Sequence, residues 1–431
     1  MSERRYQLGL REHRGMVAGW RGGQVAMVAA GASLVGGVLA LGSSPLTLGL
    51  GVAVFTSCLA GAVLPFQGRT VDEWLPVLLH HVWAQRRTFE FRLKILAEDS
   101  AGVAVVDGRL VVVLRLSAEG FALKDPNERL RLVEGFSAAL GSLCRPRGLV
   151  ERASWSFASG DTDNCHLAAD RRRRGDGPRA QLEDYAAFVS CTETIFQKRA
   201  AFLTLSTGKM QRSIALTARE LLSEARAVCR NLEVTGHHVP TLLSPEEVQT
   251  LLLAAGGREN EPGGILFSFR SSFPSAQLDD TLVASWWVAE WSRHEVGPDA
   301  LSAILLGVGK RRMSVVFEPI EAQIALRRTQ VAATKGSADD ELRRRGGFLP
   351  DRRLVRQADQ RVQREEELVG GHQSLRFVGF LAVEAKDEEE ITEEIRLTEA
   401  AAVQAGLVLR RLWGDHPRGF LAALPMCRGL S

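Results

Sequence analysis

Lysine is scarce in this sequence, with only seven among its 54 basic residues, and tyrosine occurs only twice. The formal net charge of +3 is small for 431 residues, so charge alone neither indicates nor excludes nucleic acid or acidic lipid as a partner. The six cysteines are scattered and contain no C-x-x-C pair. This spacing argues against a disulfide framework or a zinc site and predicts buried thiols in a reducing compartment.

Motifs that would carry catalysis are also missing. A P-loop requires a glycine five residues before its Gly-Lys step and Ser or Thr after it, but Gly307-Val308-Gly309-Lys310 has Ile304 and Arg311 there. This segment is therefore predicted to be a turn between strands. Residues 161–172 begin like a calcium loop but lack the glycine at position six and the acid at position twelve. His237-His238 has no acidic partner at ligand spacing.

Signatures of serine, cysteine and zinc hydrolases are absent as well. We therefore predict no catalytic, cofactor-binding or metal-binding residue, and a protein that is not an enzyme. A membrane-bound enzyme with an unrecognised site is the least favoured alternative.

Charge is absent altogether from Gly22 to Gly68. Gly42-Ser43-Ser44-Pro45 divides this stretch into two apolar halves of about 20 residues, the length that crosses a hydrocarbon core. The sequence predicts a transmembrane hairpin of two helices, Val25–Leu41 and Leu46–Leu64. Arginines flank the hairpin on both sides and its turn is uncharged, so both termini are expected on the cytoplasmic side of the cell membrane. A cleaved signal peptide is disfavoured because a second apolar stretch follows directly.

Small residues recur at every fourth position in both predicted helices: Ala29, Ser33 and Gly37 in the first, and Gly49, Ala53, Ser57 and Gly61 in the second. Such a stripe lets two helix backbones approach closely. Either the two helices pack on each other through these stripes, which we favour, or one stripe receives a helix from another subunit. After the hairpin, Trp74 and Trp83 lie at the edges of an apolar helical face, which predicts an amphipathic helix at the membrane interface.

The rest of the chain is predicted to be a cytoplasmic α+β body with mixed sheets. A membrane module over residues 1–92 precedes a first domain over 93–243 and a second over 244–431. Asp107-Gly108 between two apolar runs indicates a hairpin, and Ser244-Pro245 indicates a helix start. Residues 376–424 are predicted to form strand, helix, strand and a final strand near Gly419–Leu424, an order compatible with a ferredoxin-like half-domain.

Two charged stretches stand out in this body. A region from about residue 320 to 371 is predicted to project as a helical arm, because oppositely charged residues recur there at a spacing of four. The run Arg171–Arg174 is predicted to be a solvated surface, so direct contact with nucleic acid is not expected.

The order of these parts resembles a known family. The apolar hairpin followed by Gly68-Arg69-Thr70-Val71-Asp72-Glu73-Trp74-Leu75-Pro76-Val77-Leu78 resembles the PrgI-type small membrane subunit of actinobacterial and Gram-positive type IV secretion and conjugation systems. Three stretches, Ser314–Pro319, Arg364–His372 and Ala422–Leu430, resemble the non-catalytic amino-terminal region of the large secretion ATPase of such systems. The whole chain looks most like the streptomycete conjugal-transfer membrane proteins that fuse these two parts.

This resemblance implies a structural membrane component that anchors and docks a separate P-loop ATPase. The lipid bilayer and other membrane subunits of the secretion channel would be its further partners. No catalytic residue carries over, since the matching segments hold none. The alternative is an EccE-type membrane subunit of type VII secretion, which also has two N-terminal spans and a cytoplasmic domain; the charged arm and the Leu424-Pro425 ending speak against it.

Overall fold

A computed structural model gives the fold of the chain. The structure describes residues 22–40, 45–63, 70–71, 74, 77–78, 88–116, 124–145, 148–160, 198–209, 213–236, 240–292, 296–297, 300–307, 309–321, 323–327, 329–331, 334, 362, 366 and 373–429.

The helices and strands of the described residues are as follows: α1 (Gly22–Ala40), α2 (Pro45–Val63), β1 (Phe89–Glu98), β2 (Ala101–Val106), β3 (Arg109–Leu116), α4 (Pro126–Gly141), β4 (Val150–Gly160), β5 (Lys198–Thr207), α7 (Ile214–Val234), β6 (Thr241–Leu242), α8 (Pro245–Leu253), β7 (Arg258–Glu261), β8 (Gly264–Ser271), β9 (Ala276–Leu278), β10 (Thr281–Glu290), α9 (Ser302–Leu305), β11 (Lys310–Ile320), β12 (Ser374–Ala385), α12 (Glu388–Gln404), β13 (Val408–Arg411) and α13 (His416–Ala423).

Two local predictions are confirmed in these elements. Asp107 and Gly108 both have positive φ, which is the conformation that a tight two-residue hairpin requires, and they join β2 to β3. Ser244 caps α8 in a capping box: its hydroxyl accepts from the Glu247 amide, and the Glu247 carboxylate accepts from the Ser244 amide. Short-range sequence signals therefore identify these local features correctly.

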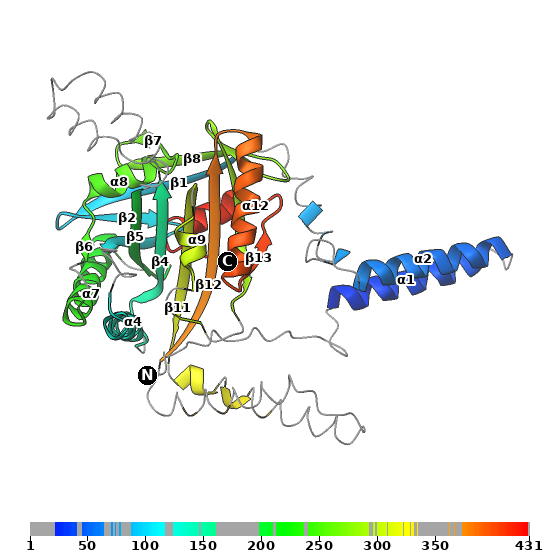
Figure 1. The fold of residues 1–431 in the computed structure, drawn as a ribbon, viewed down its shortest axis with the longest axis horizontal. Coiled ribbons are helices and arrows are strands. Elements are labelled where there is room, and N and C mark those ends of the chain that lie inside the picture. Colours follow the sequence, from blue (N-terminus) through cyan, green and yellow to red (C-terminus); the bar gives the residue numbers. More distant parts are fainter. Residues whose placement is uncertain are drawn as a thin grey trace.

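All the strands of the described residues belong to one antiparallel sheet of 13 strands, which closes on itself (Figure 1). The closed path runs β1-β2-β3-β5-β4-β11-β12-β10-β9-β8, and β8 pairs back to β1. The remaining strands pair at its margin, β7 with β8, β6 with β3 and β13 with β10. The predicted α+β arrangement of mixed, ferredoxin-like sheets is therefore wrong. Alternating apolar patterns identify strands, but they do not reveal that β1 pairs with β8 and β4 with β11 far along the chain.

The sheet consists of two structural repeats. The order β1-β2-β3-α4-β4-β5-α7-β6-α8 is followed by β8-β9-β10-α9-β11-β12-α12-β13-α13, with β7 between them. The repeats meet where counterpart strands pair, β1 with β8 and β4 with β11. Their registers are symmetric, since Phe91 lies opposite Phe267 and Ser156 lies opposite Ser314. An approximate two-fold axis thus relates the first repeat to the second.

Three hydrophobic cores hold this arrangement together. Alternate residues of β3 face opposite ways: Val111 and Val113 join the core inside the closed sheet, whereas Leu110, Val112 and Leu114 pack outward against α4 and α7. The corresponding outer core of the second repeat lies under α9, α12 and β13. Burial of both faces explains why these strands are almost continuously apolar in sequence.

The C-terminal helix α13 lies within the closed sheet, where it contacts β10, β12, β11 and β8 (Figure 1). Phe420, Leu421 and Ala422 are fully or almost fully buried in the inner core. The predicted final strand near Gly419–Leu424 is therefore wrong. A short apolar run reads alike for a buried strand and for a helix that is buried on every side, and the structure forms the helix here.

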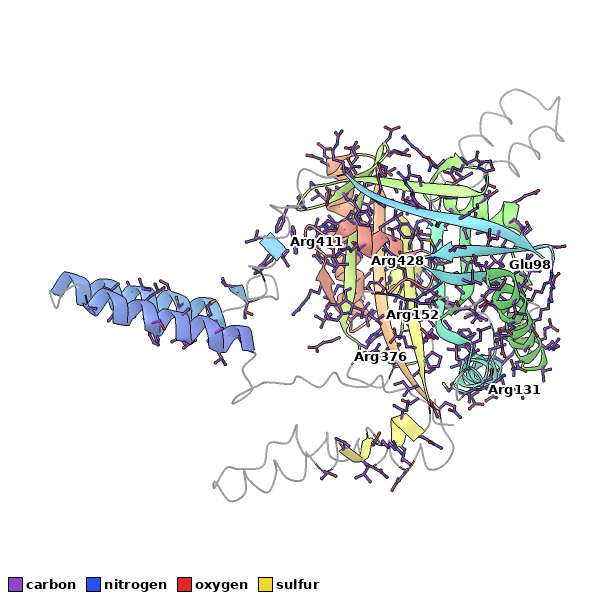
Figure 2. All side chains as sticks on the ribbon, turned by 180° about the vertical axis from the view of Figure 1, so that it is seen from behind. Glu98, Arg131, Arg152, Arg376, Arg411 and Arg428 are labelled. Atoms are coloured by element: carbon purple, nitrogen blue, oxygen red, sulfur yellow. The ribbon has the colours of Figure 1, made fainter. Side chains whose placement is uncertain are left out.

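The helices α1 and α2 form an antiparallel pair that stands apart from the body (Figures 1 and 2). Among the described residues, no helix is both long enough and apolar enough to cross a membrane. The predicted transmembrane hairpin is corrected accordingly. An uncharged stretch of sequence is therefore not enough to predict a membrane-spanning pair.

Candidate functional site

The two helices of the N-terminal pair meet through small residues. A Cβ atom added to Gly31 would lie 2.8 Å from the Cys58 Cβ, and one added to Gly61 would lie 2.9 Å from the Met27 Cε. The Gln24 side chain donates a hydrogen bond of 2.8 Å to the Ala62 carbonyl. These contacts leave no room for larger side chains at the two glycines, so the pair is closely packed.

The predicted small-residue stripes lie mostly elsewhere. Only Gly61 of the seven residues is in this contact; the other six, Ala29, Ser33, Gly37, Gly49, Ala53 and Ser57, are exposed. The hydroxyls of Ser33 and Ser57 donate to carbonyls one turn back in their own helices. The residues at a strict spacing of four therefore lie mostly on the outer surface of the pair. The contact between the helices uses other positions, such as Gly31.

Trp74, which follows the pair in the sequence, packs against the body. Its side chain is 8% exposed, and its ring lies 5.9 Å from that of Phe273 and 6.0 Å from that of Trp413. The Arg411 guanidinium stacks on Trp413 at 4.3 Å and lies on the side of the body nearest the pair (Figure 2). Phe273 and Trp413 follow β8 and β13 in loops distant in sequence, which is why sequence patterns do not reveal this cluster.

This position places Trp74 in a contact within the chain, and its role at a membrane interface stays a prediction. Trp83 lies outside the described residues. So do His237-His238, the calcium-like segment and most of the charged arm.

The Gly307–Lys310 segment leads from α9 into β11, and its glycines pack against a buried ion pair. A Cβ atom on Gly307 would lie 2.2 Å from a terminal nitrogen of Arg311, and one on Gly309 would lie 2.4 Å from the Glu394 carboxylate. Gly309 also has φ of +105°, which only glycine adopts readily. Side-chain packing and backbone geometry thus account for both glycines.

Cysteine chemistry is suppressed in the body. Burial raises the pKa of the Cys229 thiol to about 11 and that of the Cys427 thiol to about 12. A thiol with a raised pKa is a poor nucleophile at neutral pH. Cys58, Cys144, Cys229 and Cys427 are all free thiols, and no group of His, Cys, Asp and Glu suited to a metal ion occurs among the described residues.

No protein-family model matches the chain, and no curated protein is similar to it. The resemblance to conjugal-transfer proteins accordingly stays a prediction.

Proposed function

We propose that this chain is a structural component of a type IV secretion or conjugation apparatus. It is held at the cytoplasmic membrane with both ends on the cytoplasmic side, and its body docks a separate ATPase. The supporting observation is the α1–α2 pair. It carries no charged side chain and exposes several large apolar residues, and Trp74, which follows it, packs against Trp413 of the body.

The outer surface of the pair supports attachment to the membrane part of such an apparatus. Leu34 and Val52 are each 57% exposed, and Val25, Leu59 and Val63 are exposed as well. Several exposed large apolar side chains on an uncharged helix pair indicate an interaction site. The outward small residues would let helices of neighbouring subunits approach closely.

Fractionation of cells tests this part of the proposal. We expect the full-length chain to sediment with membranes and to co-purify with other membrane subunits. Leu34→Glu together with Val52→Glu should move it to the soluble fraction, because a charge on either helix opposes apolar contact. Leu253→Glu, at an exposed apolar residue on the body, is the matched control and should leave the distribution unchanged. Wild-type protein in the soluble fraction would contradict the proposal.

The proposed ATPase contact involves the charged arm. Its ends are β11 and β12, which pair along their whole length from Lys310↔Glu384 to Ile320↔Ser374. The sheet therefore continues up to the base of the arm, and shortening the arm should leave the body intact. Deleting Arg343–Glu367 is expected to abolish co-purification of the ATPase while the melting temperature of the body is retained; retained binding would rule out the arm as the docking element.

A further inference from the structure

A cavity of about 510 Å³ lies at one end of the closed sheet, where the C-terminal segment after α13 reaches β2 and β3. Its basic lining residues come from four places in the fold: Arg109 begins β3, Arg152 lies on β4, Lys209 follows β5, and Arg428 lies in the C-terminal segment. Val106, Asp107, Val111, Ser206, Met426, Cys427 and Gly429 complete the lining.

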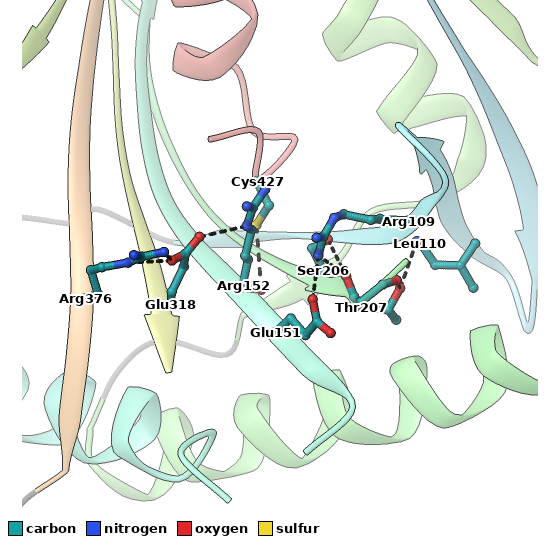
Figure 3. Close-up of polar contacts among 10 residues, drawn as sticks. Arg109, Leu110, Glu151, Arg152, Ser206, Thr207, Glu318, Arg376 and Cys427 are labelled. Atoms are coloured by element: carbon teal, nitrogen blue, oxygen red, sulfur yellow. Dashed lines mark hydrogen bonds and ion pairs between the residues drawn. The ribbon is translucent and has the colours of Figure 1, made fainter. Parts of the chain in front are cut away.

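Neighbouring groups hold Arg109 and Arg152 in place (Figure 3). Arg109 donates to the Glu151 carboxylate at 2.9 Å and to the Thr207 carbonyl at 3.0 Å. Arg152 donates through Nε to Glu318 at 3.1 Å. Each of these contacts uses only part of a guanidinium group, which has five N–H donors, so donors remain for a ligand.

Arg428 and Lys209 complete the basic set. Arg428 donates through Nε to Asp107 at 2.7 Å and stacks over the Phe91 ring at 4.4 Å. Lys209 is exposed and makes no hydrogen bond or ion pair with the described residues. Three carboxylates, Asp107, Glu151 and Glu318, face the four cations, and Glu318 is shared with Arg376. Positive charge is therefore in excess around the cavity.

The second repeat lacks two of these four positive charges. Arg109 begins β3, and the first residue of β10 is Thr281. In the first repeat, Ser206 of β5 lies opposite Val111 of β3. The corresponding pair in the second repeat is Glu384 of β12 opposite Val283 of β10. Lys209 is two residues beyond β5, whereas the residue two beyond β12 is Asp387.

Two of the four basic positions are kept in the second repeat. Arg152 lies opposite Ser206, and Lys310 lies opposite Glu384. Arg428 donates to Asp107, and Arg258, at the same distance after α8, donates to Asp279 in the same way. Arg109 and Lys209 have no basic counterpart, so the fold does not account for these two charges.

We propose that this cavity binds a small polyanion that carries a di- or triphosphate group. Guanidinium groups bind phosphate oxygens through paired hydrogen bonds, and a lysine adds a compact point charge. Ser206 also lies in the lining, and its hydroxyl donates to the Thr207 carbonyl. The volume falls within the range of about 300–1,000 Å³ that is usual for small-molecule sites. This inference does not rest on the proposed function, since it concerns a different part of the molecule.

Calorimetric titration of the full-length protein at low salt tests the site, with tripolyphosphate, ATP and inorganic phosphate as separate probes. We expect saturable binding of tripolyphosphate or ATP. Lys209→Glu should weaken it by on the order of tenfold or more, because it replaces an attraction by a repulsion in the cavity. Ser206→Glu, which copies the second repeat, should weaken binding similarly. ATP binding tighter than tripolyphosphate identifies a nucleotide as the ligand, and equal affinity identifies free polyphosphate.

The matched control is Lys386→Glu, the same charge reversal at an exposed position beside Asp387 in the second repeat. Its affinity should stay within about twofold of wild type. Absence of saturable binding to all three probes would overturn the proposal. An equal loss in Lys386→Glu and Lys209→Glu would overturn it too, since binding would then reflect net charge alone.

Discussion

Arg311 and Glu394 form an ion pair in the second repeat, with an Nη2-to-Oε2 distance of 3.3 Å and side chains that are 4% and 10% exposed. Arg311 lies at the start of β11 and Glu394 in the middle of α12, so the pair joins the helix to the sheet. Burial raises the pKa of the Glu394 carboxyl, and Arg311 opposes that shift. The pair therefore needs both partners to be tolerated in the core.

Truncating Glu394 to Ala should destabilise the body by about 3–5 kcal/mol, because the Arg311 charge would then be buried without compensation. Chemical denaturation measures this loss. Glu393→Ala is the matched control: Glu393 pairs with Arg396 on the exposed surface of the same helix, and its removal should leave the denaturation midpoint nearly unchanged. Replacing both buried partners, Arg311→Met with Glu394→Leu, should recover most of the stability. Equal losses in the single and double variants would show that the charge is not the cause.

Phe420 should be among the most costly residues to truncate in the body. Its side chain is fully buried on α13 inside the closed sheet, 5.8 Å from the ring of Phe269. Phe420→Ala is expected to lower the free energy of unfolding by about 3–5 kcal/mol through lost contacts and the cavity left behind. Val403→Ala, on the exposed face of α12, should change it by less than about 0.5 kcal/mol. Similar values for the two variants would contradict the placement of α13 in the inner core.

The same helix illustrates how far sequence reasoning reaches into this fold. Elements with local signals are predicted well: α12 runs from Glu388 to Gln404 as expected, and Gly406 ends it with positive φ. The residues of α13 have no such signal, because the apolar run Gly419–Ala423 is too short to distinguish a buried helix from a buried strand. Closure of the sheet depends on pairings such as Phe91 with Phe267, which nothing in either strand encodes by itself.

The candidate sites show the same limit. The sequence identifies the uncharged stretch and its small residues, but the contact between α1 and α2 uses Gly31, which lies outside the predicted stripes. Trp74 is recognised as notable from sequence, whereas its partners Phe273 and Trp413 become neighbours only through the tertiary fold. The basic cavity escapes prediction for the same reason, since its four cations come from four separate segments.

His416 should make the protein sensitive to mild acid. Burial, and to a smaller extent the nearby Arg411, lower its pKa to about 3, and its Nδ1 accepts a hydrogen bond of 3.1 Å from the Ser285 amide. In the unfolded chain the imidazole has its ordinary pKa of about 6.5. The contribution of His416 to the free energy of unfolding is therefore complete above pH 6.5 and is lost as the pH falls from 6.5 towards 3. At pH 5 the loss is about 2 kcal/mol.

Urea denaturation at pH 7 and pH 5 measures this loss. In His416→Asn, which keeps an acceptor but has no proton to gain, the part of the loss due to His416 should disappear. An identical loss in wild type and variant would assign the acid sensitivity to other groups.

The contact within the N-terminal pair allows a test with a close internal control. Gly31 has no room for a side chain because Cys58 of α2 lies against it, whereas a Cβ atom on Gly37 would meet nothing within 4 Å. Gly31→Leu should therefore separate the helices, and Gly37→Leu should leave them paired.

Cysteines introduced at Val35 and Gly51, which lie in contact, report the pairing through oxidative cross-linking, with Cys58 replaced by Ala. We expect efficient cross-linking in the Gly37→Leu background and little in the Gly31→Leu background. The opposite result would mean that the pair packs through the outer stripe, and the surface offered to neighbouring subunits would then be the one that contains Gly31.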